Sequence, residues 1–137
     1  MEKSDFVTYR ALVLEVRQIR ALLSELEFAR LSLGGAGVSS APRGGTPTGS
    51  ALAARSARYL DTKALYEEKL VQKEALLFSV ESAIDSLASP EERLIMRARY
   101  IQGRSWTSIC IALQREGYSE RQVYRLHGAA LLKLKEV

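Results

Sequence analysis

Two long stretches of this chain repeat apolar side chains at alternating steps of three and four residues. Between residues 5 and 33 the repeat comprises Tyr9, Leu12, Val16, Ile19, Leu23, Leu26 and Leu33, with Arg30 in the one slot that breaks it. Between residues 51 and 87 it comprises Tyr59, Tyr66, Leu70, Leu77, Val80, Ile84 and Leu87, with Lys63 and Lys73 in two further slots. This spacing lines up the apolar residues along one stripe of a helix. The pattern therefore predicts an all-α protein built on two long helices.

The segment that joins the two stretches, residues 34–50, is rich in Gly, Ser, Thr and Pro. Such a composition is typical of a flexible loop. Two long helices joined in this way are expected to form an antiparallel helical hairpin, which we assign to residues 1–88. A two-helix hairpin buries little, so it is expected to pack on the carboxyl-terminal part or on a second copy of the chain.

The sequence "SLASPEER" marks the start of a second domain, residues 89–137. Ser89 can cap a helix that has Pro90 at its first position, and Glu92 completes the spacing of a capping box. Three helices are predicted here, at about 90–102, 105–115 and 119–135, with Gly103 and Gly117 in the turns between them.

Composition excludes several classes of protein. One cysteine, Cys110, and one histidine cannot form a Cys/His zinc site, and Cys110 is interpreted as a small buried residue. No glycine-rich phosphate loop or nucleophile–base pair is visible, so no enzyme, cofactor or metal is predicted. No segment is apolar enough to span a membrane, and "MEKSDFVTYR" does not resemble a signal peptide. We expect a cytoplasmic protein.

The positive charge lies in the last third of the chain. From residue 90 onward the chain has nine lysines and arginines and five acidic residues, whereas the first 89 residues have eleven basic and eleven acidic residues. The whole net charge of +4 therefore belongs to the predicted second domain. An excess of this kind favours binding of a polyanion.

The last two predicted helices form a helix-turn-helix candidate. Ile109, Cys110 and Leu113 of its first helix are expected to pack on Val123 and Leu126 of its second. Gly117 supplies a residue that tolerates positive φ in the turn, and Ser119 caps the second helix. The first turns of that helix are crowded with side chains able to form hydrogen bonds: Glu120, Arg121, Gln122, Tyr124, Arg125 and His127.

These side chains suit the recognition of double-stranded DNA. Arg pairs with guanine edges and Gln with adenine, so Arg121, Gln122 and Arg125 are predicted to read bases. Phosphate contacts are predicted for Ser119, Tyr124, Arg104, Arg115 and Lys133. His127, one turn further along, is expected to form a hydrogen bond locally or to phosphate. Any of these residues could instead be an ordinary solvated one. Trp106 is interpreted mainly as a packing aromatic, and mid-helix Gly128 as a sign of close approach by another helix.

Residues 87–134, "LASPEERLIMRARYIQGRSWTSICIAL" followed after an insertion by "GYSERQVYRLHGAALLKL", resemble sigma factor region four, and the resemblance is specific in residues 89–134. They are still more similar to small phage and prophage proteins, the RinA and ArpU type late-transcription regulators and a related phage family of unknown function. The resemblance is architectural before residue 89. It implies that Ser119, Arg121, Gln122 and Arg125 lie in the major groove and that Thr107 lies near phosphate. The insertion, residues 114–116, is absent from most relatives and could re-aim the recognition helix.

The sequence thus predicts a phage-type, sequence-specific DNA-binding regulator of late genes. The hairpin is expected to serve either for dimerisation with a second copy of the chain or for contact with host RNA polymerase. Two alternatives remain open at this point. One is a DNA-packaging component similar to a terminase small subunit. The other is a protein-only adaptor that binds host RNA polymerase or another host complex.

Overall fold

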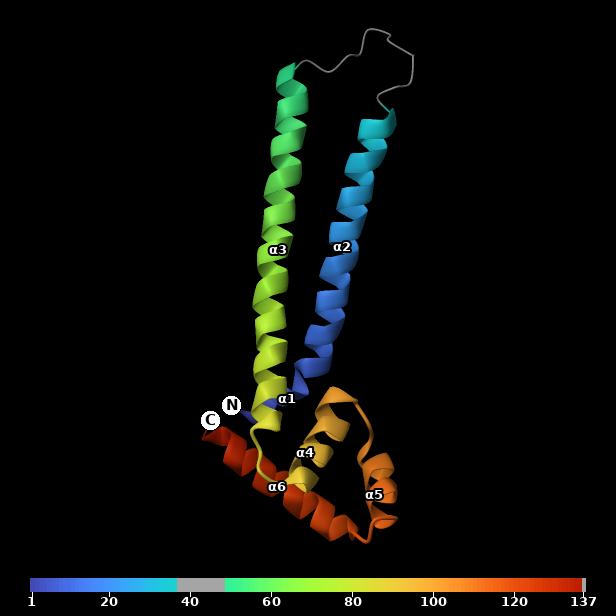
Figure 1. Ribbon diagram of the computed structural model, residues 1–137, viewed down its shortest axis with the longest axis vertical. Coiled ribbons are helices and arrows are strands. Elements are labelled where there is room, and N and C mark those ends of the chain that lie inside the picture. Colours follow the sequence, from blue (N-terminus) through green and yellow to red (C-terminus); the bar gives the residue numbers. More distant parts are fainter. Residues whose placement is uncertain (37–48, 137) are drawn as a thin grey trace. The chain divides into compact units, whose positions relative to one another are not determined.

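The computed structural model describes residues 1–36 and 49–136, and every regular element in these ranges is helical (Figure 1). In chain order the elements are α1 (Lys3–Val7), α2 (Tyr9–Ala36), α3 (Gly49–Asp85), α4 (Pro90–Met96), the π-helical turn η1 (Arg97–Ile101), α5 (Trp106–Gln114) and α6 (Glu120–Lys135). The predicted all-α class is confirmed.

The first predicted helix, residues 5–33, differs from the structure at both ends. It is divided into α1 and α2 at Thr8, whose hydroxyl donates a 3.1 Å hydrogen bond to the Asp5 carbonyl. At its other end the helix extends three residues beyond Leu33, because α2 continues to Ala36. Most of the predicted loop, residues 37–48, lies outside the described residues. The second long helix starts and ends two residues earlier than predicted.

The chain forms two compact units whose boundaries differ from the predicted division at residue 88. The terminal unit consists of Met1–Leu14 and Glu74–Val137, and the hairpin unit of Glu15–Lys73. The difference arises because Phe6 and Tyr9, from the start of the chain, share a core with Ile84 of α3 and Leu134 of α6. Both ends of the predicted hairpin are therefore part of the carboxyl-terminal core.

In the hairpin unit the parts of α2 and α3 that belong to it run antiparallel. Lys73 forms an ion pair with Glu15, and the Tyr59 hydroxyl donates a hydrogen bond to Glu27. The Glu27–Tyr59 pair lies between Glu15 and Lys73 in the sequence. Nested pairs of this kind are expected when two helices run antiparallel. The basic residues at the predicted apolar positions are accommodated by partners: Lys73 by Glu15, and Arg30 by the Tyr59 ring, 5.3 Å from its guanidinium carbon.

The terminal unit has two hydrophobic clusters. The first joins α1 and the ends of α2 and α3 to α4, η1 and the second half of α6. The second joins α4 and η1 to α5 and the first half of α6, and it contains the predicted contacts of Ile109, Cys110 and Leu113 with Val123 and Leu126. α4, η1 and α6 contribute residues to both clusters, so these three elements connect them.

The predicted helix over 90–102 is α-helical in α4 and becomes π-helical in η1. In η1 the Gln102 amide donates to the Arg97 carbonyl five residues earlier, at 2.9 Å. A π-helical turn widens the helix and shifts the phase of the side chains that follow. Here Ala98 is buried in the second cluster and Tyr100 in the first. Gly103, predicted to lie in the turn that follows, has a positive φ of 69°.

Candidate nucleic-acid interface

Helix α6 begins at a capped and well-defined turn. Gly117 has a φ of 91°, a conformation that residues with a Cβ rarely adopt. The Ser119 hydroxyl accepts a hydrogen bond from the Gln122 amide at 3.2 Å, and the Gln122 side chain accepts one from the Ser119 amide at 2.8 Å. The predicted cap is therefore present, and it is a reciprocal capping box. It fixes the direction in which the first turn of α6 presents its side chains.

The two faces of α6 differ sharply. Val123, His127, Ala130 and Leu134 are buried, whereas Arg121, Arg125, Gly128 and Leu132 follow one another at steps of four, three and four and are exposed. A Cβ added at Gly128 would meet no atom within 4 Å. The expectation that Gly128 receives a neighbouring helix was therefore wrong for the described residues. The exposed face is polar at its start and apolar at its end.

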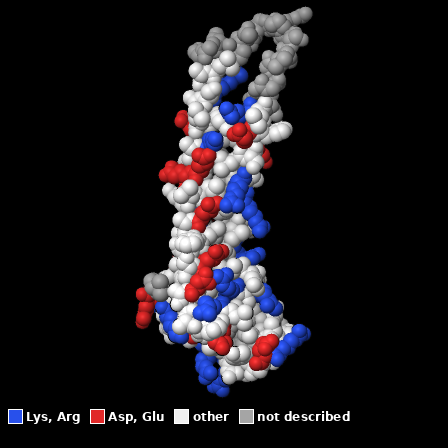
Figure 2. Space-filling view, viewed as in Figure 1, with Lys and Arg blue, Asp and Glu red and all other residues white. Residues whose placement is uncertain are grey.

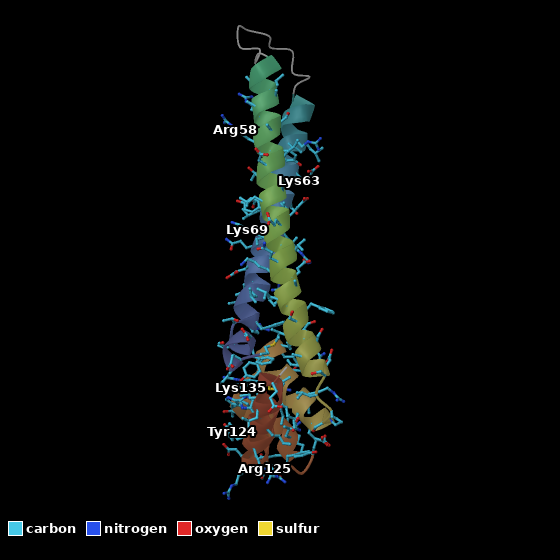
Figure 3. The ribbon with its side chains drawn as sticks, turned by 90° about the vertical axis from the view of Figure 1, so that its left-hand side faces the viewer. Arg58, Lys63, Lys69, Tyr124, Arg125 and Lys135 are labelled. Carbon is cyan, nitrogen blue, oxygen red and sulfur yellow. The ribbon has the colours of Figure 1, made fainter. Side chains whose placement is uncertain are left out.

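Six of the predicted interface residues lie together on the first two turns of α6 and its cap, and all are exposed: Ser119, Glu120, Arg121, Gln122, Tyr124 and Arg125. Tyr124 and Arg125 project from α6 in Figure 3. Gln122 needs a correction, because its side-chain oxygen is engaged in the cap. Pairing with both edge atoms of adenine requires the oxygen and the amino group together. Gln122 can offer only its amino group while the cap is closed.

The predicted phosphate contacts on α5 are also exposed. Thr107 lies in the first turn of α5, and Arg115 follows its last residue. The Arg104 guanidinium donates to the Ser108 hydroxyl at 2.9 and 3.2 Å, which orients it at the start of α5. Within the 114–116 insertion, Gln114 ends α5 and the other two residues form the turn toward α6. Basic groups thus stand at both ends of α5.

Lys133 does not offer a free charge as predicted. Its ammonium donates to the Glu92 carboxylate at 2.8 Å, and the Glu92 side chain is buried. Glu92 also does not complete the predicted capping box at the start of α4. The Ser89 hydroxyl accepts from the Glu92 amide at 3.3 Å, but that hydroxyl donates to Glu91. Since Lys133 forms an ion pair with the buried Glu92 carboxylate, we interpret it as a residue that stabilises the fold.

His127 is buried in the terminal unit. Its Nε2 lies 2.8 Å from the Tyr100 hydroxyl, and its ring meets Trp106 edge to face at 4.6 Å. Burial, together with the nearby cations Lys3 and Arg99, lowers the pKa of His127 to about 4. The imidazole is therefore neutral near pH 7. Of the two options, the predicted local hydrogen bond is the one the structure shows.

Three further residues lie close to this interface, and no sequence pattern connects them to one another. Lys3, Arg99 and Trp106 line an open cavity beside α6, together with Tyr124. Trp106 had been assigned mainly to packing, and its ring does contact His127 and Tyr124. Lys3 and Arg99 lie 96 positions apart in the chain. Only the packing of α1 on the terminal unit brings them to the same cavity.

Within residues 1–36 and 49–136, no group of three or more His, Cys, Asp or Glu side chains is arranged to hold a metal ion. Cys110 is buried, and burial raises the pKa of its thiol. In the same ranges, no helix combines the length and apolar content that crossing a membrane requires.

Comparisons of the chain with models of known protein families, with curated proteins and with solved structures found no match. The resemblance of residues 89–134 to sigma factor region four therefore stays a prediction. What the molecule does has to be argued from the geometry of α5, α6 and the residues around them.

Proposed function

We propose that this chain binds double-stranded DNA and inserts the first turns of α6 into the major groove. The observation that carries the proposal is the exposure of Arg121 and Arg125 on a turn fixed by a reciprocal cap. An α-helix fits the major groove, and arginine pairs with two acceptors on a guanine edge. Four residues rise about 6 Å along a helix axis, so these arginines would address positions about two base pairs apart.

The surroundings of α6 supply the contacts that such a helix needs on the DNA backbone. Arg104, Thr107 and Arg115 are exposed at the two ends of α5. Contacts to phosphate position a protein on the duplex without reading its sequence. On the face seen in Figure 2, basic side chains project from the end of the terminal unit that α5 and α6 form. Binding through these groups would weaken steeply as the salt concentration rises.

The proposal extends to a biological role through the resemblance described above. In that role the chain is a phage-type transcriptional regulator of late genes, acting in a bacterial cytoplasm, with host RNA polymerase as a candidate partner. The packaging and adaptor alternatives predict different behaviour. A packaging component would assemble as a ring, and an adaptor would bind a host protein but no DNA.

The hairpin unit supports self-association within this proposal. On α3, Leu60, Ala64 and Val71 are exposed at steps of four and seven, which places them along one stripe of the helix. Phe28 and Leu31 on α2 are also exposed. A single recognition helix reads few base pairs, whereas a two-fold dimer reads two half-sites. Sedimentation of the intact chain tests this point: a dimer supports the proposal, and a ring of eight or more copies favours packaging.

The decisive experiment is selection from a randomised duplex library, followed by fluorescence anisotropy with the selected duplex. Arg121→Ala and Arg125→Ala should each cost about 1–3 kcal/mol in specific binding, with the preference relaxed at one position of the site. Arg58→Ala, which removes the same charge from the first third of α3 (Figure 3), is the matched control and should bind as the parent chain does. Circular dichroism verifies that each variant is folded. Enrichment of no sequence, with equal affinity in all three variants, would overturn the proposal.

A further inference from the structure

The terminal unit has an open cavity of about 400 Å³ beside α6 that combines aromatic rings with cations. Its walls come from three parts of the chain: α1, the end of η1 with the start of α5, and α6. The lining residues are Lys3, Val7, Arg99, Tyr100, Trp106, Tyr124 and His127. The packing of Phe6 against Tyr100, with ring centroids 5.7 Å apart, holds α1 in place at this wall.

The aromatic side of the cavity is ordered by ring contacts. The Trp106 ring lies 5.1 Å from that of Tyr124, with a 48° angle between their planes, and 4.6 Å from that of His127. On the cationic side, the Arg99 guanidinium carbon lies 5.0 Å from the Trp106 ring centre. The Arg99 side chain also donates to the Arg104 carbonyl at 3.1 Å. The guanidinium is thus held in one orientation.

The positive charge in this cavity is not neutralised. The Arg99 guanidinium donates to a backbone carbonyl and not to a carboxylate, and Lys3 forms no ion pair with any of the described residues. The charged groups that act on the buried imidazole of His127 are Lys3 and Arg99, both cations. Because no acidic residue is among those of the described chain that line the cavity, the cavity favours an anionic group. The adjacent rings offer a flat apolar surface beside that anion.

We propose that this cavity holds the sugar–phosphate backbone of the DNA whose major groove receives α6, with a phosphate between Lys3 and Arg99. This inference rests on the proposed function. The location favours it, because Tyr124 lines the cavity and also lies three residues after Arg121 on α6. Residues three apart are neighbours on a helix surface. A duplex that engages Arg121 therefore brings its backbone past Tyr124.

An acidic peptide shares the negative charge but fits the observations less well. Phosphates recur at regular intervals on either side of a groove, so a helix in the groove has a backbone strand close beside it. Arg99 presents a planar guanidinium, whose donors match two phosphate oxygens. The sugar ring that follows each phosphate would lie on Trp106 and Tyr124. In this assignment α1 belongs to the DNA-binding surface.

Trp106 makes the proposal directly measurable, since it is the only tryptophan in the chain. Titration of the full chain with a random-sequence duplex at low salt should change the Trp106 emission in parallel with the anisotropy of the labelled duplex. Polyglutamate of equal total charge should leave the emission unchanged. A response to polyglutamate without one to the duplex assigns the cavity to an acidic protein segment and overturns the proposal.

The salt dependence of binding tests the two cations. Lys3→Gln should reduce the slope of log affinity against log salt by about 1, and the double variant with Arg99→Gln by about 2. Preference for the selected duplex over a random one should stay the same, because phosphate contacts carry no sequence information. Lys69→Gln on α3 (Figure 3) removes an equal charge elsewhere and should leave the slope unchanged.

Two further results separate the possible failures. Arg99→Lys keeps the charge, so it should restore most of the slope; loss of slope in both Arg99 variants would point to a packing role for Arg99 and overturn its assignment. Duplex binding seen by anisotropy with no change in Trp106 emission or in slope overturns the cavity assignment alone. Absence of duplex binding by the parent chain overturns the proposed function and this inference together.

Discussion

The terminal unit and the hairpin unit are both helical, but they bury their apolar residues to very different degrees. Phe6, Ile84, Ile95, Met96 and Val123 of the terminal unit are fully buried, whereas the best-buried residues of the hairpin unit, Val16 and Ile19, remain 6% and 7% exposed. Phe28 of the hairpin unit is 73% exposed. Two helices bury only the side chains along their line of contact, whereas several helices packed around one another enclose a core. The difference teaches that a periodic pattern alone does not create an interior.

The largest expected effect contrasts two phenylalanines. Phe6→Ala should lower the free energy of unfolding by about 3–5 kcal/mol, because it empties a fully buried site shared by several helices. Phe28→Ala should change it by about 0.5 kcal/mol or less in the monomer, since the ring is exposed. Urea titration followed by circular dichroism measures both. Equal losses would show that the two units are packed alike and would break the comparison.

Acidification should act on the terminal unit through His127. The unfolded imidazole takes up a proton below its ordinary pKa of 6.5, but the folded one resists protonation down to about pH 4. The neutral imidazole's contribution to the free energy of unfolding is complete above pH 6.5 and declines as the pH falls toward 4, by about 3 kcal/mol in total. Urea titrations monitored by Trp106 emission should show this decline between pH 6.5 and 5. His127→Gln should abolish the slope in that window, and a slope that persists would assign it to other groups.

A pair of tyrosines gives a smaller contrast. Tyr100→Phe removes the hydroxyl that meets His127 Nε2 at 2.8 Å and leaves a buried ring nitrogen without its partner, which should cost about 1–2 kcal/mol. Tyr59→Phe removes a hydroxyl bonded to Glu27 on the surface of the hairpin unit, which should cost about 0.5 kcal/mol or less. Thermal unfolding compares the two variants. A larger loss for Tyr59→Phe would contradict the assigned difference in burial.

The last contrast exchanges glycine and alanine at two exposed helix positions. Gly128→Ala should stabilise the terminal unit by about 1 kcal/mol, because the added methyl group meets nothing within 4 Å and alanine favours a helix. Ala64→Gly makes the reverse exchange in α3 of the hairpin unit and should cost about 1 kcal/mol. Denaturant midpoints of the two variants should move in opposite directions. Destabilisation by Gly128→Ala would mean that another part of the chain approaches α6.

Local signals in the sequence predicted most elements of the terminal unit. Ser119 as a cap and Gly117 at positive φ follow from chemistry confined to a few neighbouring residues, and both predictions are confirmed. The contacts of Ile109 and Leu113 with Val123 also follow from spacing along two adjacent helices. The cap at Ser89 was only half correct, because Glu92 is drawn to Lys133, 41 positions away.

In the candidate site, too, some features could be predicted from local sequence and others depend on distant contacts. Exposure of Arg121 and Arg125 follows from their place on α6 opposite the apolar face, and sequence periodicity finds it. The roles of His127 and Lys133 depend on Tyr100 and Glu92, which no local pattern connects to them. The cavity of Lys3, Arg99 and Trp106 was missed because α1 was expected to belong to the hairpin.

By itself, then, the sequence determined that this chain is helical, where most of its helices begin and end, and which face of α6 meets water. These properties depend on backbone hydrogen bonds, caps and side-chain spacing within a few turns. The tertiary structure alone decided that residues 1–14 join the carboxyl-terminal core and that two distant cations share a cavity with the only tryptophan. The reason is physical: burial of Phe6 is the sum of contacts from several helices, and that sum exists only once they have packed together.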